Sequence, residues 1–189
     1  MMEQYRGFNE VKSNNEQPEN KVCNEAKSSN EKPDNNGMDH IELGKQLEFF
    51  TKLPEVGQGL VLWKPHGAMF RYLLEKFSKE AHVLNGYEWV VTPHIGKSNL
   101  WETSGHLDFY KESMYSPIDI DGEQYYLKPM SCPFHVMIYQ DGIKSYRDLP
   151  VRLAEFAQVY RYELSGTLHG LTRVRGFTQD DAHIIGTPE

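Results

Sequence analysis

Two segments late in the chain concentrate side chains that bind anions. Tyr160-Arg161-Tyr162-Glu163 places a guanidinium two residues before a carboxylate, and Arg173-Val174-Arg175-Gly176-Phe177 adds two arginines and an aromatic ring. A fixed guanidinium can hold a carboxylate and a phosphate together, because its planar donors match both groups. Most arginines instead form surface ion pairs of small energetic value. The residues therefore indicate an anion site and leave open whether its ligand is ATP or RNA.

Cys132 and His183 are of the types that bind transition metals. Their separation fits no finger-type zinc motif, so each alone is better explained as a buried thiol or a hydrogen-bonded imidazole than as a metal ligand. Gln179 and Asp181 lie just before His183 in the sequence. For Asp180 we expect an ordinary solvated carboxylate at a strand edge.

The elements that must position these side chains begin at about Asp39. Residues 9–37 are mostly Asn, Glu, Lys, Ser and Pro, and such a composition buries too little apolar surface to offset the entropy of ordering. We therefore predict a disordered leader over residues 1–37 and one folded domain over residues 38–189. The domain should begin with a short helix that has Asp39 near its N-cap and carries apolar residues from Ile41 to Phe50.

Periodicity and turn residues predict the other elements of the domain. Residues 151–160 could be helix or strand, and residues 168–177 suit a loop that closes over a charged ligand. The remaining expected elements are a strand over 60–63, a helix over 68–81 that ends at Asn85-Gly86, a strand over 87–92 stopped by Pro93, a hairpin of 115–120 and 124–128 around Asp121-Gly122, and a strand over 177–185.

Composition excludes several classes of protein. The chain has 189 residues and a formal net charge of −7, which argues weakly against a general nucleic-acid surface. No apolar run is long enough to cross a bilayer, so no membrane partner is expected. The first 20 residues carry four glutamates and a single arginine, and the whole chain has two cysteines. These features fit neither a secretory signal nor a disulfide framework and favour a cytoplasmic location.

Longer strings of residues carry a family resemblance. Residues 86–93 resemble the first signature of class II aminoacyl-tRNA synthetases, and 160–163 followed by 173–177 resemble the second. Four further strings resemble threonyl-tRNA synthetases in particular: 39–45, 128–133, 145–150 and 176–183. The resemblance covers essentially everything after Asp39. It implies an α+β class II catalytic fold, a mainly antiparallel sheet flanked by helices, which in this chain is incomplete at its C-terminal side.

The resemblance also implies a reaction and its substrates. It implies ATP-dependent activation of threonine, with Mg²⁺ accompanying ATP, and transfer to threonine tRNA. Arg161 would be the catalytic group between the threonine carboxylate and the α-phosphate. Gln179 and Asp181 would bind threonine, with Asp181 accepting a hydrogen bond from its hydroxyl. The ATP-binding residues would be Glu163, Arg173 and Phe177.

A zinc ion is a further implication of the resemblance. Cys132 and His183 would be two of its three protein ligands, and the third, a His, would lie beyond this chain. Zinc would bind the amino and hydroxyl groups of threonine, and valine would be rejected because it lacks the hydroxyl. Since the resemblance places only His183 at the metal, His106, His135 and His169 are not predicted as ligands.

Assembly and alternative functions complete the expectations. The resemblance implies a homodimer through the region around Pro93, and an incomplete sheet with an apolar edge would also favour association. The third signature of the class and the anticodon-binding domain are not in this sequence. A noncatalytic accessory or decayed synthetase paralogue is therefore one alternative, and another class II ligase, for proline or serine, is a second.

Overall fold

The computed structural model describes residues 39–142 and 145–187. The predicted leader lies outside these residues, so its boundary stays a prediction. Residues Gly37–Glu189 group as one compact unit. Within the described ranges, no helix is both long and apolar enough to cross a membrane.

The N-terminal part of the unit consists of α1 (His40–Gln46), a ribbon of β1 (Phe50–Thr51) and β2 (Leu62–Trp63), and the long helix α2 (Pro65–Leu84). The predicted helix over 68–81 and its end at Asn85 are confirmed, and Pro65 occupies the first turn, where a missing N–H costs nothing. Gly67 is required at the start of α2, because a Cβ there would overlap the carbonyl of Phe49.

The first helix differs from its prediction in two ways. Asp39 is the N-cap residue, but its side chain makes no capping bond and pairs with His40 instead. The helix ends at Gln46, so Phe50 lies on β1, where its ring packs against Gly44. The apolar pattern from Ile41 to Phe50 therefore spans a helix and a strand and not one helical face.

The sheet that matters for function has the order β3-β7-β8. β7 (Val151–Tyr160) pairs antiparallel with β8 (Gly176–Ile185) along its whole length, and β3 (Glu88–Trp89) runs parallel to β7. The ambiguous segment 151–160 is thus a strand, and the predicted strand over 177–185 is confirmed. The predicted strand over 87–92 is shorter than expected, because only Glu88 and Trp89 of this segment pair with β7.

A second sheet has the order β4-β6-β5 and is antiparallel throughout. It consists of β4 (Ile95–Lys97), β5 (Ile118–Ile120) and β6 (Glu123–Leu127). The predicted hairpin is confirmed: Asp121 and Gly122 have φ angles of 58° and 82°, as a two-residue type I′ turn requires. The prediction of an α+β fold with mainly antiparallel strands holds, although the strands divide into three sheets.

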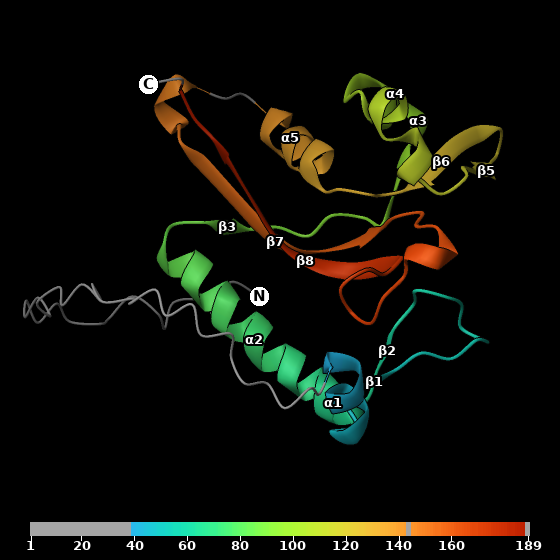
Figure 1. Ribbon diagram of the computed structural model, residues 1–189. Coiled ribbons are helices and arrows are strands. Elements are labelled where there is room, and N and C mark those ends of the chain that lie inside the picture. Colours follow the sequence, from blue (N-terminus) through green and yellow to red (C-terminus); the bar gives the residue numbers. More distant parts are fainter. Residues whose placement is uncertain (1–38, 143–144, 188–189) are drawn as a thin grey trace, which may run out of the picture. The chain divides into compact units, whose positions relative to one another are not determined.

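Helices cover both faces of the β7–β8 pair (Figure 1). α5 (Cys132–Gln140) lies on one face and α2 on the other. α3 (Ser98–Thr103) and α4 (His106–Phe109) lie beside β4 and β6, and the short 3-10 turns are η2 (Lys111–Ser113), η3 (Tyr146–Asp148) and η4 (Ser165–Thr167). The fully buried residues of the core include Trp101, Ala154, Ala157 and Val159.

Candidate functional site

Alternation along β8 brings several predicted site residues onto one face. Side chains of a strand point alternately to its two faces, so Phe177, Gln179, Asp181 and His183 share a face. Asp181 lies opposite Glu155 of β7 in the ladder. This face is the one that α5 covers, and we call it the α5 face.

Arg161 lies at one end of the α5 face, just after β7. Its Nε donates to the carbonyl oxygen of Pro129 at 3.2 Å, and its guanidinium carbon is 5.2 Å from the centre of the Phe177 ring. This geometry is a cation–π contact, which restrains the guanidinium from two sides. The structure therefore brings Arg161 and Phe177 together.

Cys132 begins α5 and belongs to the same group of side chains. Burial raises the pKa of its thiol, the Asp181 carboxylate adds to the rise, and the Arg161 guanidinium opposes it. The sulfur therefore lies within the electrostatic reach of both groups. The hydroxyl of Ser131, one residue earlier, bonds to the Asp181 carboxylate.

His183 is held on the α5 face by a second histidine. Its Nδ1 is 2.9 Å from Nδ1 of His135 and 3.9 Å from the Asp181 carboxylate. His135 is fully buried, and its Nε2 lies 3.1 Å from the Glu155 carboxylate. Glu155, His135 and His183 thus form a chain of hydrogen bonds that orients the predicted metal ligand.

A buried ionic cluster around Glu155 anchors this chain of hydrogen bonds. The Glu155 carboxylate accepts bonds from the backbone N–H of Thr92 at 3.0 Å and from its hydroxyl at 2.7 Å. The ammonium of Lys128 is 3.8 Å from the same carboxylate, and both side chains are almost fully buried. Burial by itself would raise the pKa of Glu155, but the bonds from His135 and Thr92 and the charge of Lys128 lower it overall.

This lowered pKa predicts acid sensitivity. The folded chain holds Glu155 ionised at a pH where the unfolded chain would protonate it, so the stabilisation is complete above the ordinary carboxyl pKa of about 4.3 and is lost as the pH falls below it. Glu155→Gln should lower the free energy of unfolding at pH 7 by about 1–3 kcal/mol and flatten its fall below pH ~4.3. Chemical denaturation between pH 3 and 7 measures both. An equally steep acid limb in the variant would show that other carboxylates cause it.

The predicted ATP residues Glu163 and Arg173 form a separate part of the site. Arg173 Nε donates to the Glu163 carboxylate at 2.9 Å, and Arg175 Nε donates to the Glu163 carbonyl at 2.9 Å. A pocket of about 450 Å³ lies beside this pair, with Ser113 and Tyr162 among its lining residues. Glu163 therefore bonds to both of the arginines that precede β8.

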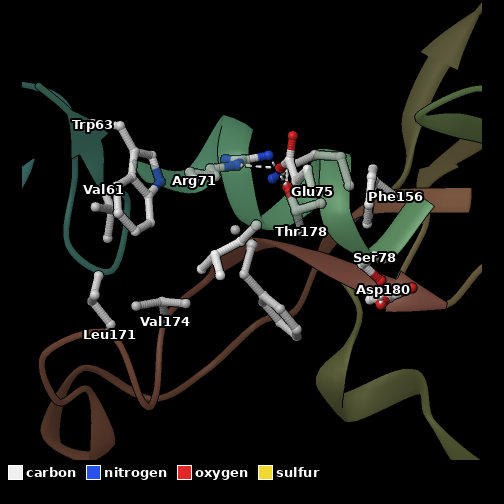
Figure 2. Close-up of a pocket in the computed structure, with 14 residues that line it drawn as sticks. Val61, Trp63, Arg71, Glu75, Ser78, Phe156, Leu171, Val174, Thr178 and Asp180 are labelled. Atoms are coloured by element: carbon white, nitrogen blue, oxygen red, sulfur yellow. Dashed lines mark hydrogen bonds and ion pairs between the residues drawn. The ribbon is translucent and has the colours of Figure 1, made fainter. Parts of the chain in front are cut away.

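The opposite face of β8 carries a different pocket, of about 510 Å³, between α2 and the sheet (Figure 2). Arg71 donates to Glu75 and, at 2.7 Å, to the hydroxyl of Thr178. Asp180, expected to be simply solvated, is exposed but bonds to Ser78 and to His82 on α2. The predicted ATP-binding residue Phe177 also lines this pocket. The contacts of Arg161 and His183 lie on the other side of the sheet, so we assign the α5 face as the candidate site.

Comparisons of sequence and fold show which class of protein this chain is similar to. Residues 112–189 match the family model of the tRNA synthetase class II core domain (G, H, P, S and T). The prolyl-tRNA synthetase of Giardia lamblia shares the fold, with a TM-score of 0.67 at 19% identity over 76% of this chain and 30% of that chain. Residues 112–189 are therefore similar to the core domain of class II aminoacyl-tRNA synthetases, and the described part of the chain has a fold of that class.

Within that class the sequence is similar to threonine–tRNA ligases. The enzyme of Aquifex aeolicus is 60% identical over 151 residues, which are 80% of this chain and 24% of that protein, and the enzyme of Borrelia duttonii is 60% identical over 80% of this chain and 26% of its own length. A crystal structure described as the RNA-binding domain of the threonyl-tRNA synthetase of Cryptosporidium parvum has a TM-score of 0.76 and 43% identity over 79% of this chain and 37% of that chain. The chain spans about a quarter of the length of these curated relatives.

Proposed function

We propose that this chain is the front part of the catalytic domain of a threonine–tRNA ligase, which activates threonine with ATP and Mg²⁺ and transfers it to threonine tRNA. One observation carries the proposal. Phe177, Gln179, Asp181 and His183 share one face of β8, and Arg161 lies over Phe177 at the end of that face. The similarity to threonine–tRNA ligases at 60% identity supports the same reading.

In this proposal Arg161 bridges the threonine carboxylate and the α-phosphate of ATP. Phe177, whose ring contacts Arg161, lies against the adenine. Arg173, whose side chain is 55% exposed, reaches the outer phosphates. Asp181 accepts the threonine hydroxyl and Gln179 lines the amino-acid pocket.

The donor set on the α5 face fits a zinc ion in part. A thiolate and an imidazole are ligands that zinc prefers, and Cys132 and His183 supply them. Among the residues that the structure describes, no three His, Cys, Asp or Glu side chains gather closely enough to hold a metal. When bound, zinc would supply a Lewis acid that recognises the amino and hydroxyl groups of threonine.

Assembly as a homodimer is also part of the proposal. α2 exposes a row of apolar side chains, of which Phe77 is 73% accessible, and Val91 near Pro93 is 84% accessible. Apolar surface of this kind marks sites of protein association. The region around Pro93, with α2, is therefore the proposed dimer surface. The proposed location of the protein is the cytoplasm.

A segment exchange tests the proposed function. Residues 39–189 replace the matching segment of the Aquifex aeolicus enzyme, and the chimera is assayed for amino-acid-dependent exchange of pyrophosphate into ATP. We expect exchange with threonine and not with valine. Exchange that depends on proline or serine would assign another class II ligase. A folded chimera without any exchange would favour the noncatalytic alternative.

A further inference from the structure

A contact between α1 and the loop of residues 168–175 joins parts of the chain that are 131 positions apart. The backbone N–H of Leu171 donates to Nε2 of His40 at 3.0 Å. The other ring nitrogen of His40, Nδ1, lies 2.6 Å from the Asp39 carboxylate. The His40 ring is also 5.6 Å from that of His169.

The contacts of His40 with Leu171 and Asp39 define the tautomer of its imidazole. An N–H group can donate only to a nitrogen with a lone pair, so Nε2 of His40 must be unprotonated. The ring proton is then on Nδ1 and points to Asp39. Asp39 therefore acts through His40: it holds the ring in the one neutral form that can accept the Leu171 N–H.

Gly170 shows that the loop tip lies very close to the His40 ring. Its φ angle is 48°, a left-handed conformation that glycine adopts readily. A Cβ at this position would overlap Nε2 of His40. The loop tip therefore reaches the imidazole only because residue 170 has no side chain.

The tip of the loop and Arg173 form one unit. His169 and Arg173 exchange two backbone hydrogen bonds, each of 3.0 Å, so the tip is a closed hairpin. At its exit, the N–H of Arg175 donates to the Gly59 carbonyl at 2.7 Å. Leu171 and Val174 line the pocket on the α2 side together with Val61 (Figure 2). A shift of the tip would therefore displace the guanidinium of Arg173.

We infer that His40 is a positioning residue for the loop of residues 168–175: its imidazole, oriented by Asp39, holds the loop tip at Leu171 and thereby fixes the position of Arg173. That the ligand of Arg173 is the polyphosphate of ATP rests on the proposed function. The bond between His40 and the loop does not depend on it. His40 itself touches no substrate in this arrangement.

The hydrogen bond is tested in the 189-residue chain labelled with ¹⁵N. Nuclear magnetic resonance should detect a scalar coupling across the bond between the Leu171 amide nitrogen and Nε2 of His40. Trypsin cleavage after Arg173 measures how often the loop opens, because cleavage follows the population of the open form when reclosing is fast. His40→Ala should raise this cleavage about fivefold, the factor that corresponds to one ordinary hydrogen bond.

Four further variants distinguish loss of this hydrogen bond from general destabilisation. His40→Gln offers an amide oxygen at similar reach and should restore slow cleavage. Glu42→Ala, on the exposed side of the same helix, should leave cleavage unchanged. Gly170→Ala should open the loop, whereas Gly166→Ala, where a Cβ meets open space, should not. A missing coupling together with equal cleavage in His40→Ala and Glu42→Ala would overturn the inference.

Kinetics of the chimera test the positioning role. His40→Ala should raise the KM for ATP about fivefold and leave the KM for threonine unchanged, and His40→Gln should restore it. If His40→Ala increased cleavage of the loop but left the KM for ATP unchanged, His40 would not position Arg173. If the chimera shows no exchange at all, the proposed function fails, and the coupling and cleavage results still decide whether His40 holds the loop.

Discussion

Replacing Arg161 by alanine in the chimera is expected to slow threonine-dependent pyrophosphate exchange by roughly 100- to 1000-fold, the usual cost of one preorganised charge donor. The guanidinium is already fixed before substrate binds, by its bond to Pro129 and its contact with Phe177. Negative charge increases at the α-phosphate as the carboxylate attacks, so a fixed positive charge stabilises the transition state more than the substrates. The loss should therefore appear mainly in kcat.

Two lysine variants control this prediction. Arg161→Lys keeps the charge but loses the planar set of donors, so its rate should recover only partly. Arg152→Lys, on β7 and paired with Ile184 of β8, should exchange at the original rate. If Arg161→Ala raised KM alone and left kcat unchanged, Arg161 would be a binding group and not the catalytic one.

Local signals in the sequence predicted the turns and ends of elements well. Asn85-Gly86 ends α2, and Asp121-Gly122 closes the β5–β6 hairpin, because a residue that tolerates positive φ is needed at each place. Strand lengths were predicted less well. β3 has two residues where the pattern indicated six, since pairing depends on a partner strand that no local pattern contains.

The candidate site shows the same difference between local patterns, which the sequence contains, and long-range contacts, which it does not. Alternation in β8 was enough to place Gln179, Asp181 and His183 on one face, and this required only the strand assignment. α5 was not predicted, because Pro133 and the short apolar run around it give little helical periodicity. His135 was set aside as a metal ligand, and its bond to His183 was missed.

One signal could have indicated His135. It follows Cys132 by three residues, the spacing that places two side chains on the same side of a helix. Recognition of the helix would therefore have put His135 beside the predicted metal ligands. The bond from Leu171 to His40 had no such signal, because it joins segments that are remote in sequence and meet only through the fold.

The zinc proposal leads to a prediction about Cys132. Cys132→Ser in the chimera should weaken zinc binding at least about a hundredfold, because loss of a supporting contact alone typically costs 10- to 100-fold and here a ligand is lost. The thiol of Cys132 has a raised pKa owing to burial, so binding a metal as thiolate must release a proton. Zinc per chain, measured by elemental analysis after dialysis against a weak chelator, and proton release on zinc addition give two readings that require no catalysis.

Histidine variants show whether the effect belongs to the predicted pair. His183→Gln should lose zinc to a similar extent, since an amide replaces an imidazole donor. His82→Gln removes an imidazole from α2, on the opposite face of β8, where the ring bonds to Asp180, and should leave the zinc content unchanged. If the Cys132 and His183 variants retained zinc while threonine-dependent exchange persisted, the metal would lie elsewhere. Asp181 and Gln179 would then have to distinguish threonine from valine by hydrogen bonds alone, a distinction that a site built around the hydroxyl can make because valine leaves its polar groups unpaired.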